Sequence, residues 1–235
     1  MKTSNRILLT TLVLTLLILT AIHIALFARL RSGDVTIIKN AQKAEFEEHV
    51  LNNVNYILMD GLDNVSIAPS DSLSLSVRKV DAHRVDYRVI GDTLLVRLDT
   101  AEQASAQHDY LPVLINIPSS IPVEARYSYI NLTGSRDSVK ASSNIFILTR
   151  SVLSVNQQQE TFKQYWKQLS ILASGESTIN LDRVAIIDSS NIQLTQSNFD
   201  DNRAIFQKLT ITSDYDSKLS FAPQNLKKAT ITIKP

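Results

Sequence analysis

Residues 177–194, STINLDRVAIIDSSNIQL, contain the alternating pattern from which the fold class is predicted. In the runs Ile179-Asn-Leu181 and Ile192-Gln-Leu194, apolar residues occupy every second position, and a polar Ser or Asn introduces each run. A period of two is typical of a β-strand with one buried face. The same form recurs as Tyr129-Ile-Asn-Leu132 and Ser217-Lys-Leu-Ser-Phe221. The repeats return after about 15–25 residues, as coils of a solenoid do, so we expect strands stacked in parallel sheets.

Alternation of apolar and polar residues also dominates the chain before this repeat. Examples are Leu73-x-Leu75-x-Val77, Leu94-x-Val96-x-Leu98 and Val113-x-Ile115-x-Ile117. Asp, Ser, Pro and Gly-Asp turns separate these runs, and no long helical stripe lies between them. The fold class predicted for residues 44–235 is therefore an all-β, β-solenoid-like domain. A β-sandwich is the alternative, although hairpin signals of the Asn-Gly type are missing from the second half.

Two segments depart from the strand pattern. Residues 39–52 could form a short amphipathic helix, and residues 157–168, QQQETFKQYWKQ, could be a helical or loop insertion. Neither segment has a strong apolar period, so both assignments rest on weak periodicity.

An apolar segment near the N-terminus predicts one transmembrane α-helix. Residues 7–28 contain no formal charge and are bracketed by Arg6 and Arg29. A helix of this length would rise about 33 Å, which exceeds a hydrocarbon core of about 30 Å. A cleaved signal peptide is the alternative, but its apolar region is usually about 7–15 residues long and ends at a small-x-small site. We expect an uncleaved anchor.

The anchor predicts the organisation and the location of the chain. We expect a cytoplasmic stub over residues 1–6, the span over 7–28, a juxtamembrane linker over 29–43 and an ectodomain over 44–235. Basic residues lie on both sides of the span, so the positive-inside rule does not decide the orientation. The short stub and the domain type favour a single-pass protein of the bacterial inner membrane, with the ectodomain in the periplasm or outside the cell.

Composition excludes several classes of function. The chain has no cysteine, which removes disulfides, thiolate zinc sites, iron–sulfur clusters and cysteine nucleophiles. Residues 32–235 carry 20 basic and 23 acidic side chains, without a basic cluster. A nucleic-acid partner is therefore not expected. Neither is a cofactor.

The strand-and-turn pattern resembles the head GIN domain family of proposed autotransporter adhesins, which occurs in bacterial envelope proteins. The resemblance is carried by Asn64-Val-Ser-Ile67, which is similar to the family's "(D/N)VxI" strand, by Gly91-Asp-Thr-Leu-Leu-Val-Arg-Leu98, and by Val113–Pro118. It covers about residues 44–235. It implies a right-handed β-helix-like ectodomain, and it supplies no catalytic residues to carry over. The chain departs from the family in having only five glycines and a membrane helix.

No group of residues has the spacing of a catalytic or metal site. His49, His83 and His108 lie in different segments without ligand spacing, and no Gly-x-Ser-x-Gly elbow exists. Asp214 and Asp216 form the acid pair most suited to a hidden site, because clustered carboxylates serve acid–base chemistry or bind calcium. Solvated turn acids are far commoner than such sites.

Aromatic side chains mark the candidate binding surface. They concentrate at two places, and exposed aromatics on a β-surface can stack on sugars or anchor a partner protein. Burial in the core is the competing interpretation and the commoner one. With the acid pair included, the candidate residues are Tyr127, Tyr129, Tyr165, Trp166, Asp214 and Asp216.

Three functions remain open. The leading hypothesis is a non-enzymatic envelope protein, anchored in the lipid bilayer through residues 7–28, whose ectodomain serves in adhesion, scaffolding or binding of an envelope protein or a glycan. The first alternative is a polysaccharide-active β-helix enzyme, which rests on the acid pair and on fold analogy. The second alternative is a membrane partner in envelope sensing or signalling. The pattern predicts no oligomeric state.

Overall fold

The structure is a computed structural model that describes residues 11–21, 23, 45–99, 112–119, 121–155 and 162–234. The chain divides into two compact units, Met1–Phe46 and Glu47–Pro235, and each is described by itself.

The first unit contains an α-helix over residues 11–21. Side chains along it return to its own backbone: Thr15 Oγ1 donates to the carbonyl of Thr11 at 2.9 Å, and Thr20 Oγ1 donates to that of Leu16 at 2.7 Å. Within the described residues, no helix combines the length and the apolar character needed to cross a membrane. The rest of the expected span, the stub over residues 1–6 and the linker over 29–43 lie outside the described residues, apart from residue 23.

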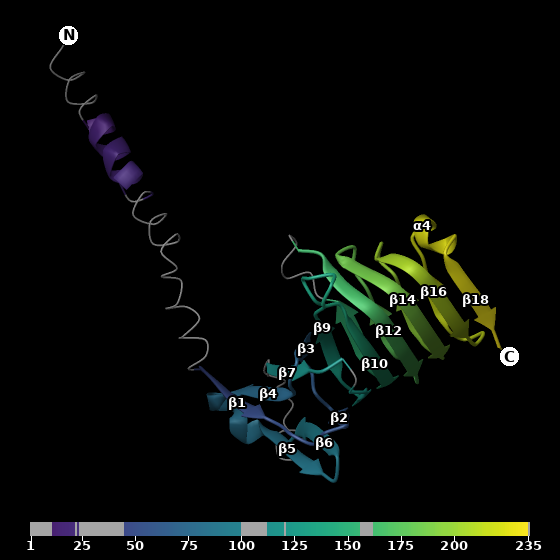
Figure 1. The fold of residues 1–235 in the computed structure, drawn as a ribbon. Coiled ribbons are helices and arrows are strands. Elements are labelled where there is room, and N and C mark those ends of the chain that lie inside the picture. The colour runs from purple at the N-terminus through teal and green to yellow at the C-terminus, as the bar shows by residue number, and fades with distance from the viewer. Residues whose placement is uncertain are drawn as a thin grey trace. The chain divides into compact units, whose positions relative to one another are not determined.

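The second unit consists almost entirely of β-strands in two sheets of nine strands each (Figure 1). In sheet A the strand order is β1-β4-β7-β3-β9-β11-β13-β15-β17, and in sheet B it is β18-β16-β14-β12-β10-β8-β2-β6-β5. The strands of sheet A are β1 (Phe46–Val50), β3 (Val65–Pro69), β4 (Ser74–Arg78), β7 (Val113–Ile117), β9 (Tyr129–Leu132), β11 (Val152–Val155), β13 (Thr178–Asn180), β15 (Asn198–Asp200) and β17 (Lys218–Ser220). The strands of sheet B are β2 (Tyr56–Asp60), β5 (Val85–Ile90), β6 (Thr93–Leu98), β8 (Val123–Arg126), β10 (Ser142–Thr149), β12 (Gln164–Ser174), β14 (Ala185–Thr195), β16 (Ile205–Ser213) and β18 (Ala229–Ile233). A 3₁₀ helix, η1 (Lys79–Arg84), and a short helix, α4 (Pro223–Leu226), complete the unit.

Successive coils each place one strand in sheet B and the next in sheet A. From β8/β9 through β16/β17 the strands stack in parallel on the same strands of the preceding coil. Inward positions of neighbouring coils are in register, so that Ile171, Ile192 and Ile211 form one buried column. The chain is therefore an all-β protein whose body is a β-solenoid, as the alternating pattern predicted.

The first coils are stacked out of chain order. Strand β2 lies between β6 and β8, and β3 lies between β7 and β9, so coil β2/β3 is inserted between two later segments. The chain leaves β3, forms the antiparallel pairs β4·β7 and β5·β6, and then returns to the other side of β2 as β8. These antiparallel strands and η1 build the end of the solenoid that carries β1 and β5.

Two helical interpretations from the sequence are wrong where the structure describes them. Residues 46–50, within the expected helix over 39–52, form strand β1. Residues 164–168, within the expected insertion over 157–168, belong to the eleven-residue strand β12. Sheet pairing overrides the weak local periodicity in both segments. Residues 39–44 and 157–161 lie outside the described residues, and the right-handed twist of the coils stays a prediction.

Candidate binding surface

From β8/β9 onward, a serine stands at the corner where each coil passes from sheet B to sheet A. At most of these corners its hydroxyl accepts a hydrogen bond from the preceding coil: Leu62 N donates to Ser128 Oγ, Ser128 N to Ser151 Oγ, and Ser151 N to Ser177 Oγ, each at 3.1 Å. Ser197 N donates in the same way to Ser217 Oγ at 3.0 Å. The serines from Ser128 to Ser197 are buried, so their polar atoms stabilise the stack.

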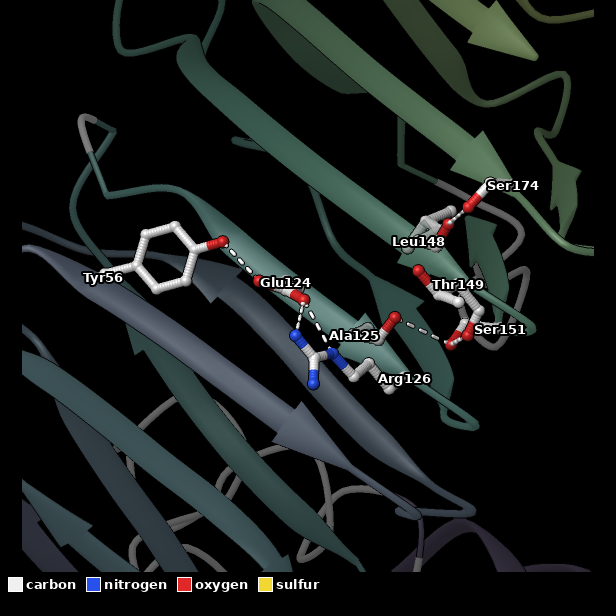
Figure 2. Close-up of polar contacts among 8 residues, drawn as sticks. All are labelled: Tyr56, Glu124, Ala125, Arg126, Leu148, Thr149, Ser151 and Ser174. Carbon is white, nitrogen blue, oxygen red and sulfur yellow. Dashed lines mark hydrogen bonds and ion pairs between the residues drawn. The ribbon is translucent and has the colours of Figure 1, made fainter. Parts of the chain in front are cut away.

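The hydroxyl hydrogens of these serines bond back to main-chain carbonyls. Ser151 Oγ lies 3.0 Å from the carbonyl oxygen of Ala125 and 2.9 Å from that of Thr149 (Figure 2). Ser174 Oγ, at the end of β12, donates to the carbonyl of Leu148 in the same view. These hydrogen bonds tie the corners to their own coil and to the neighbouring one.

The outer face of sheet B carries an apolar row interrupted by one carboxylate. Outward side chains in register across β2, β8, β10 and β12 are Leu58, Glu124, Ile147 and Leu172. Leu172 is 42% exposed, and Ile145, two residues before Ile147 on β10, is exposed to the same extent. We call Leu58, Glu124, Ile145, Ile147 and Leu172 the sheet B patch.

Glu124 is fixed by two neighbours on the same face. The phenol of Tyr56, on β2, donates to Glu124 Oε2 at 2.6 Å, and Arg126 Nε donates to Oε1 at 2.7 Å (Figure 2). The second guanidinium nitrogen, Nη2, lies 2.6 Å from the same Oε1. Two arginine nitrogens on Oε1 and the phenol on Oε2 orient the carboxylate, which reduces the entropic cost of ordering it on binding.

The electrostatics of this trio favour a fixed ion pair. Burial and the hydrogen bond to Glu124 raise the pKa of Tyr56 to about 12. Burial alone would raise the pKa of Glu124, but hydrogen bonds from Tyr56 and Arg126 outweigh it and hold that pKa below its usual range. At neutral pH the carboxylate is ionised and the phenol is protonated, so the trio has neither a general base nor a general acid near its working pH.

Of the predicted aromatic residues, Tyr127 and Tyr129 are exposed. Tyr127 occupies a B-to-A corner with a φ of 49° and is 56% exposed, and Tyr129 starts β9 and is 39% exposed. The Arg150 guanidinium lies 5.8 Å from the Tyr127 ring centroid, and its Nη1 is 3.4 Å from the phenol oxygen. These two tyrosines are the predicted aromatic residues that the structure leaves exposed.

Trp166 requires a correction because it is a core residue. Its side chain is 1% exposed, and its ring packs against Gly134, whereas Tyr165 beside it is half-buried and faces outward. A register shift in the pairing of β10 with β12 leaves Lys167 and Gln168 both exposed. This bulge reverses the inward and outward positions before it, so Trp166 presents no surface to a partner.

The predicted acid pair is part of a turn. Asp214 Oδ1 accepts from Ser217 Oγ at 2.6 Å, and its Oδ2 accepts from the amide of Gln196 at 2.8 Å. The hydrogen bond from Ser217 is the main cause that lowers the pKa of Asp214. Asp216 is exposed and shares none of these bonds. In the described part of the chain, no group of three or more His, Cys, Asp or Glu side chains could hold a metal ion.

The sheet B patch was not predicted from the sequence. Leu58, Glu124, Ile147 and Leu172 come from strands up to 114 residues apart, and only the register of the sheet places them in one row. The alternation within each strand indicates which of its residues face outward. It does not indicate which residues of the strands in other coils lie beside them.

Comparisons with known proteins give fold-level similarities only. The chain matches no protein-family model and no curated protein. It is similar to a proposed adhesin from Parabacteroides distasonis, at 13% identity and a TM-score of 0.44, over 80% of this chain and 75% of that chain. It is also similar to a proposed adhesin from Bacteroides fragilis, at 10% identity and a TM-score of 0.40, over 80% of this chain and 95% of that chain. A proposed lipid-binding protein from Parabacteroides distasonis is similar at 11% identity and a TM-score of 0.39, over 80% of this chain and 75% of that chain. At these identities and scores the similarities carry no argument about function, and membership of the head GIN family stays a prediction.

Proposed function

We propose that this chain is a membrane-anchored, non-enzymatic binding module of a bacterial envelope, and that the sheet B patch docks a protein partner. The observation that carries the proposal is the row Leu58, Glu124, Ile147 and Leu172 on the outer face of sheet B, where Leu172 is exposed and the other three are partly exposed. Protein interfaces combine apolar anchors with a few oriented polar groups, and arginine is enriched among them.

The chemistry of the patch favours a protein over a glycan. Sugars are bound by exposed aromatic faces, whereas the exposed side chains here are aliphatic. The one aromatic residue beside the row, Tyr56, directs its hydroxyl into the bond with Glu124. A glycan would instead suit the Tyr127 and Tyr129 corner, which presents two exposed rings.

A non-enzymatic role is supported by how the polar groups are used. The carboxylates of Glu124 and Asp214 accept hydrogen bonds that lower their pKa, and both stabilise local structure. A polysaccharide-active enzyme needs one carboxylic acid whose pKa is raised so that it can donate a proton. Neither group meets that requirement.

Membrane anchoring rests on the uncharged stretch over residues 7–28, whose described part is helical over residues 11–21. We expect the full chain to stay in the membrane pellet after extraction with alkaline carbonate. A variant that lacks residues 7–28 should appear in the supernatant. Release of the full chain by carbonate would contradict the anchor.

The docking proposal is tested by photo-crosslinking in the native host. A photoreactive amino acid at position 147, in the sheet B patch, should give one discrete protein adduct. The same probe at position 154, on the outer face of sheet A, is the matched control and should give none. Adding Leu172→Asp to the position-147 variant should abolish the adduct, because an unpaired carboxylate in a desolvated contact costs on the order of several kcal/mol.

Two results would overturn the proposal. An adduct that survives Leu172→Asp, or one that forms equally from position 154, would place the contact elsewhere. Retention of the purified full chain on isolated cell-wall sacculi, lost on Tyr127→Ala but not on Leu172→Asp, would identify a glycan-binding corner instead.

A further inference from the structure

The two ends of the solenoid expose strand edges and uncovered core positions. At one end, β17 is the edge strand of sheet A and β18 is the edge strand of sheet B, and we call this the β17/β18 end (Figure 1). At the other end the edge strands are β1 and β5, which form the β1/β5 end. Within the described residues, no further strand pairs with these four edges. Such edges are templates for pairing with another chain.

At the β17/β18 end, the inward-facing residues of the last strand are not covered by a further coil within the described residues. Ile231 pairs in register with Ile211 and Ile233 with Ser213, and both of these partners are buried. Ile231 is nevertheless 37% exposed and Ile233 is 55% exposed. Leu226, at the end of α4, which precedes β18 in the chain, is 56% exposed. Apolar side chains at core positions are thus left facing solvent.

The β1/β5 end shows the same feature. Val89 pairs in register with Leu94, which is fully buried, yet Val89 is 43% exposed. Its neighbour Ile90 is 58% exposed, and Val50, the last residue of β1, is 61% exposed. Both ends therefore present apolar side chains around open backbone edges.

The charges of the β17/β18 end and of strand β1 are opposite, whereas β5, the other edge strand of the β1/β5 end, carries one acid and one base, Asp86 and Arg88. Residues 217–234 at the β17/β18 end contain four exposed lysines and no acid, namely Lys218, Lys227, Lys228 and Lys234. Residues 45–50, which include β1, contain three exposed glutamates and neither Lys nor Arg, namely Glu45, Glu47 and Glu48. Charges of either sign could blunt an edge. The opposite signs of the β17/β18 end and β1 additionally make contacts between like ends repulsive and contacts between unlike ends attractive.

We propose that the solenoids assemble head to tail, with the β17/β18 end of one copy docked on the β1/β5 end of a second copy of this chain. Sheet A continues from β17 into β1, where Lys218 meets the glutamates, and sheet B continues from β18 into β5. Ile231 and Ile233 are covered by the side of β5 that carries Val89. Because the contact joins two different surfaces, it is heterologous and generates an open array rather than a closed dimer.

The absence of cysteine from the natural sequence makes a crosslinking test specific. Ile233→Cys and Val89→Cys are introduced singly and together into the full chain in detergent micelles. The reagent is a bismaleimide that spans about 8 Å, enough for direct and diagonal cross-strand neighbours. The double variant should form a ladder of dimers, trimers and larger species. Each single variant should stay monomeric, and a mixture of the two should form dimers only.

Every other pattern overturns the proposal. Dimers of Ile233→Cys alone indicate a tail-to-tail contact, and dimers of Val89→Cys alone indicate a head-to-head contact. If the double variant forms no ladder, the two ends do not dock, and the lysines serve only to keep the edge strand from pairing with another chain. As a control for reactivity, Asn191→Cys with Ile233→Cys should give no ladder, because Asn191 is an exposed residue in the middle of sheet B.

Charge reversal provides an independent readout. Lys218→Glu in the double-cysteine background should reduce the ladder at least several-fold, because two acidic edges then face each other. Adding Glu48→Lys to the same chain should restore it. A ladder that is insensitive to Lys218→Glu, or one that Glu48→Lys fails to restore, would exclude the sheet A contact described above.

Discussion

The amide of Ser128 donates a hydrogen bond to the hydroxyl oxygen of Ser151, 3.1 Å away, across the boundary between two successive coils. The amide of Ser151 donates in turn to Ser177. Ser151 and Ser177 therefore each satisfy a backbone amide of the coil before them, which the regular strand pairing leaves without a partner. This serine relay ties successive coils together at their corners.

Replacing Ser151 with Ala should lower the free energy of unfolding by about 1–3 kcal/mol, because the buried amide of Ser128 loses its acceptor. Urea denaturation of the full chain measures the change. Ser154→Ala, three residues later on the outer face of sheet A, is the control and should be within about 0.5 kcal/mol of the wild type. Equal losses for the two variants would mean that the relay has no special energetic role.

Gly134→Ala should destabilise the chain by about 1–3 kcal/mol through overpacking. A Cβ at this position would lie 2.7 Å from two ring atoms of Trp166. The same substitution should cost less in a Trp166→Phe background, because the smaller ring leaves space. A double-mutant cycle from thermal or urea unfolding measures this coupling, and additive effects would contradict it.

Glu124→Gln should lower the pKa of Tyr56 from about 12 toward its ordinary value of 10.0, although burial, the largest cause of the shift, remains. The folded pKa lies above the unfolded one, so the stabilisation by the neutral phenol is fully present below about pH 10 and is lost between about pH 10 and 12. In the Glu124→Gln variant this stabilisation should be lost at a lower pH than in the wild type. Ultraviolet titration of tyrosinate, with Tyr56→Phe as the difference reference, reports the shift.

Asp214→Ala should lower the melting temperature, whereas Asp216→Ala should leave it unchanged. Asp214 accepts bonds from Ser217 and from the amide of Gln196, while Asp216 is exposed. Because the pKa of Asp214 is lowered in the folded chain, its contribution is present above its ordinary pKa and is lost as the pH falls through the lowered value. The melting temperature of Asp214→Ala should therefore respond less to acid than that of the wild type, which calorimetry across the acid range would test.

The sequence was sufficient to predict strands and corners because both depend on neighbours along the chain. Alternation in Ile179-Asn-Leu181 and Ile192-Gln-Leu194 reports burial of one face, and both runs are strand segments with buried apolar positions. The serine at 177 was expected in a turn and lies in one. Only its role as an acceptor for the adjacent coil depended on the three-dimensional stack.

Inward and outward positions were less predictable where a bulge interrupts the strand. Counting by twos from the buried Leu169 places Lys167 and Tyr165 inside and Trp166 outside. The bulge at Lys167 and Gln168 reverses this parity, so the aromatic residue expected on the surface is in the core. One inserted residue changes every position before it, and no local pattern announced the insertion.

A repeated apolar period and a serine at each corner thus specify a stacked β-structure, because strand formation and corner geometry depend on residues close together in the chain. The order of the first coils and the row that contains Glu124 required the folded molecule. Strand β2 pairs with β8 across more than sixty residues, and that choice depends on which apolar faces bury one another rather than on any short motif.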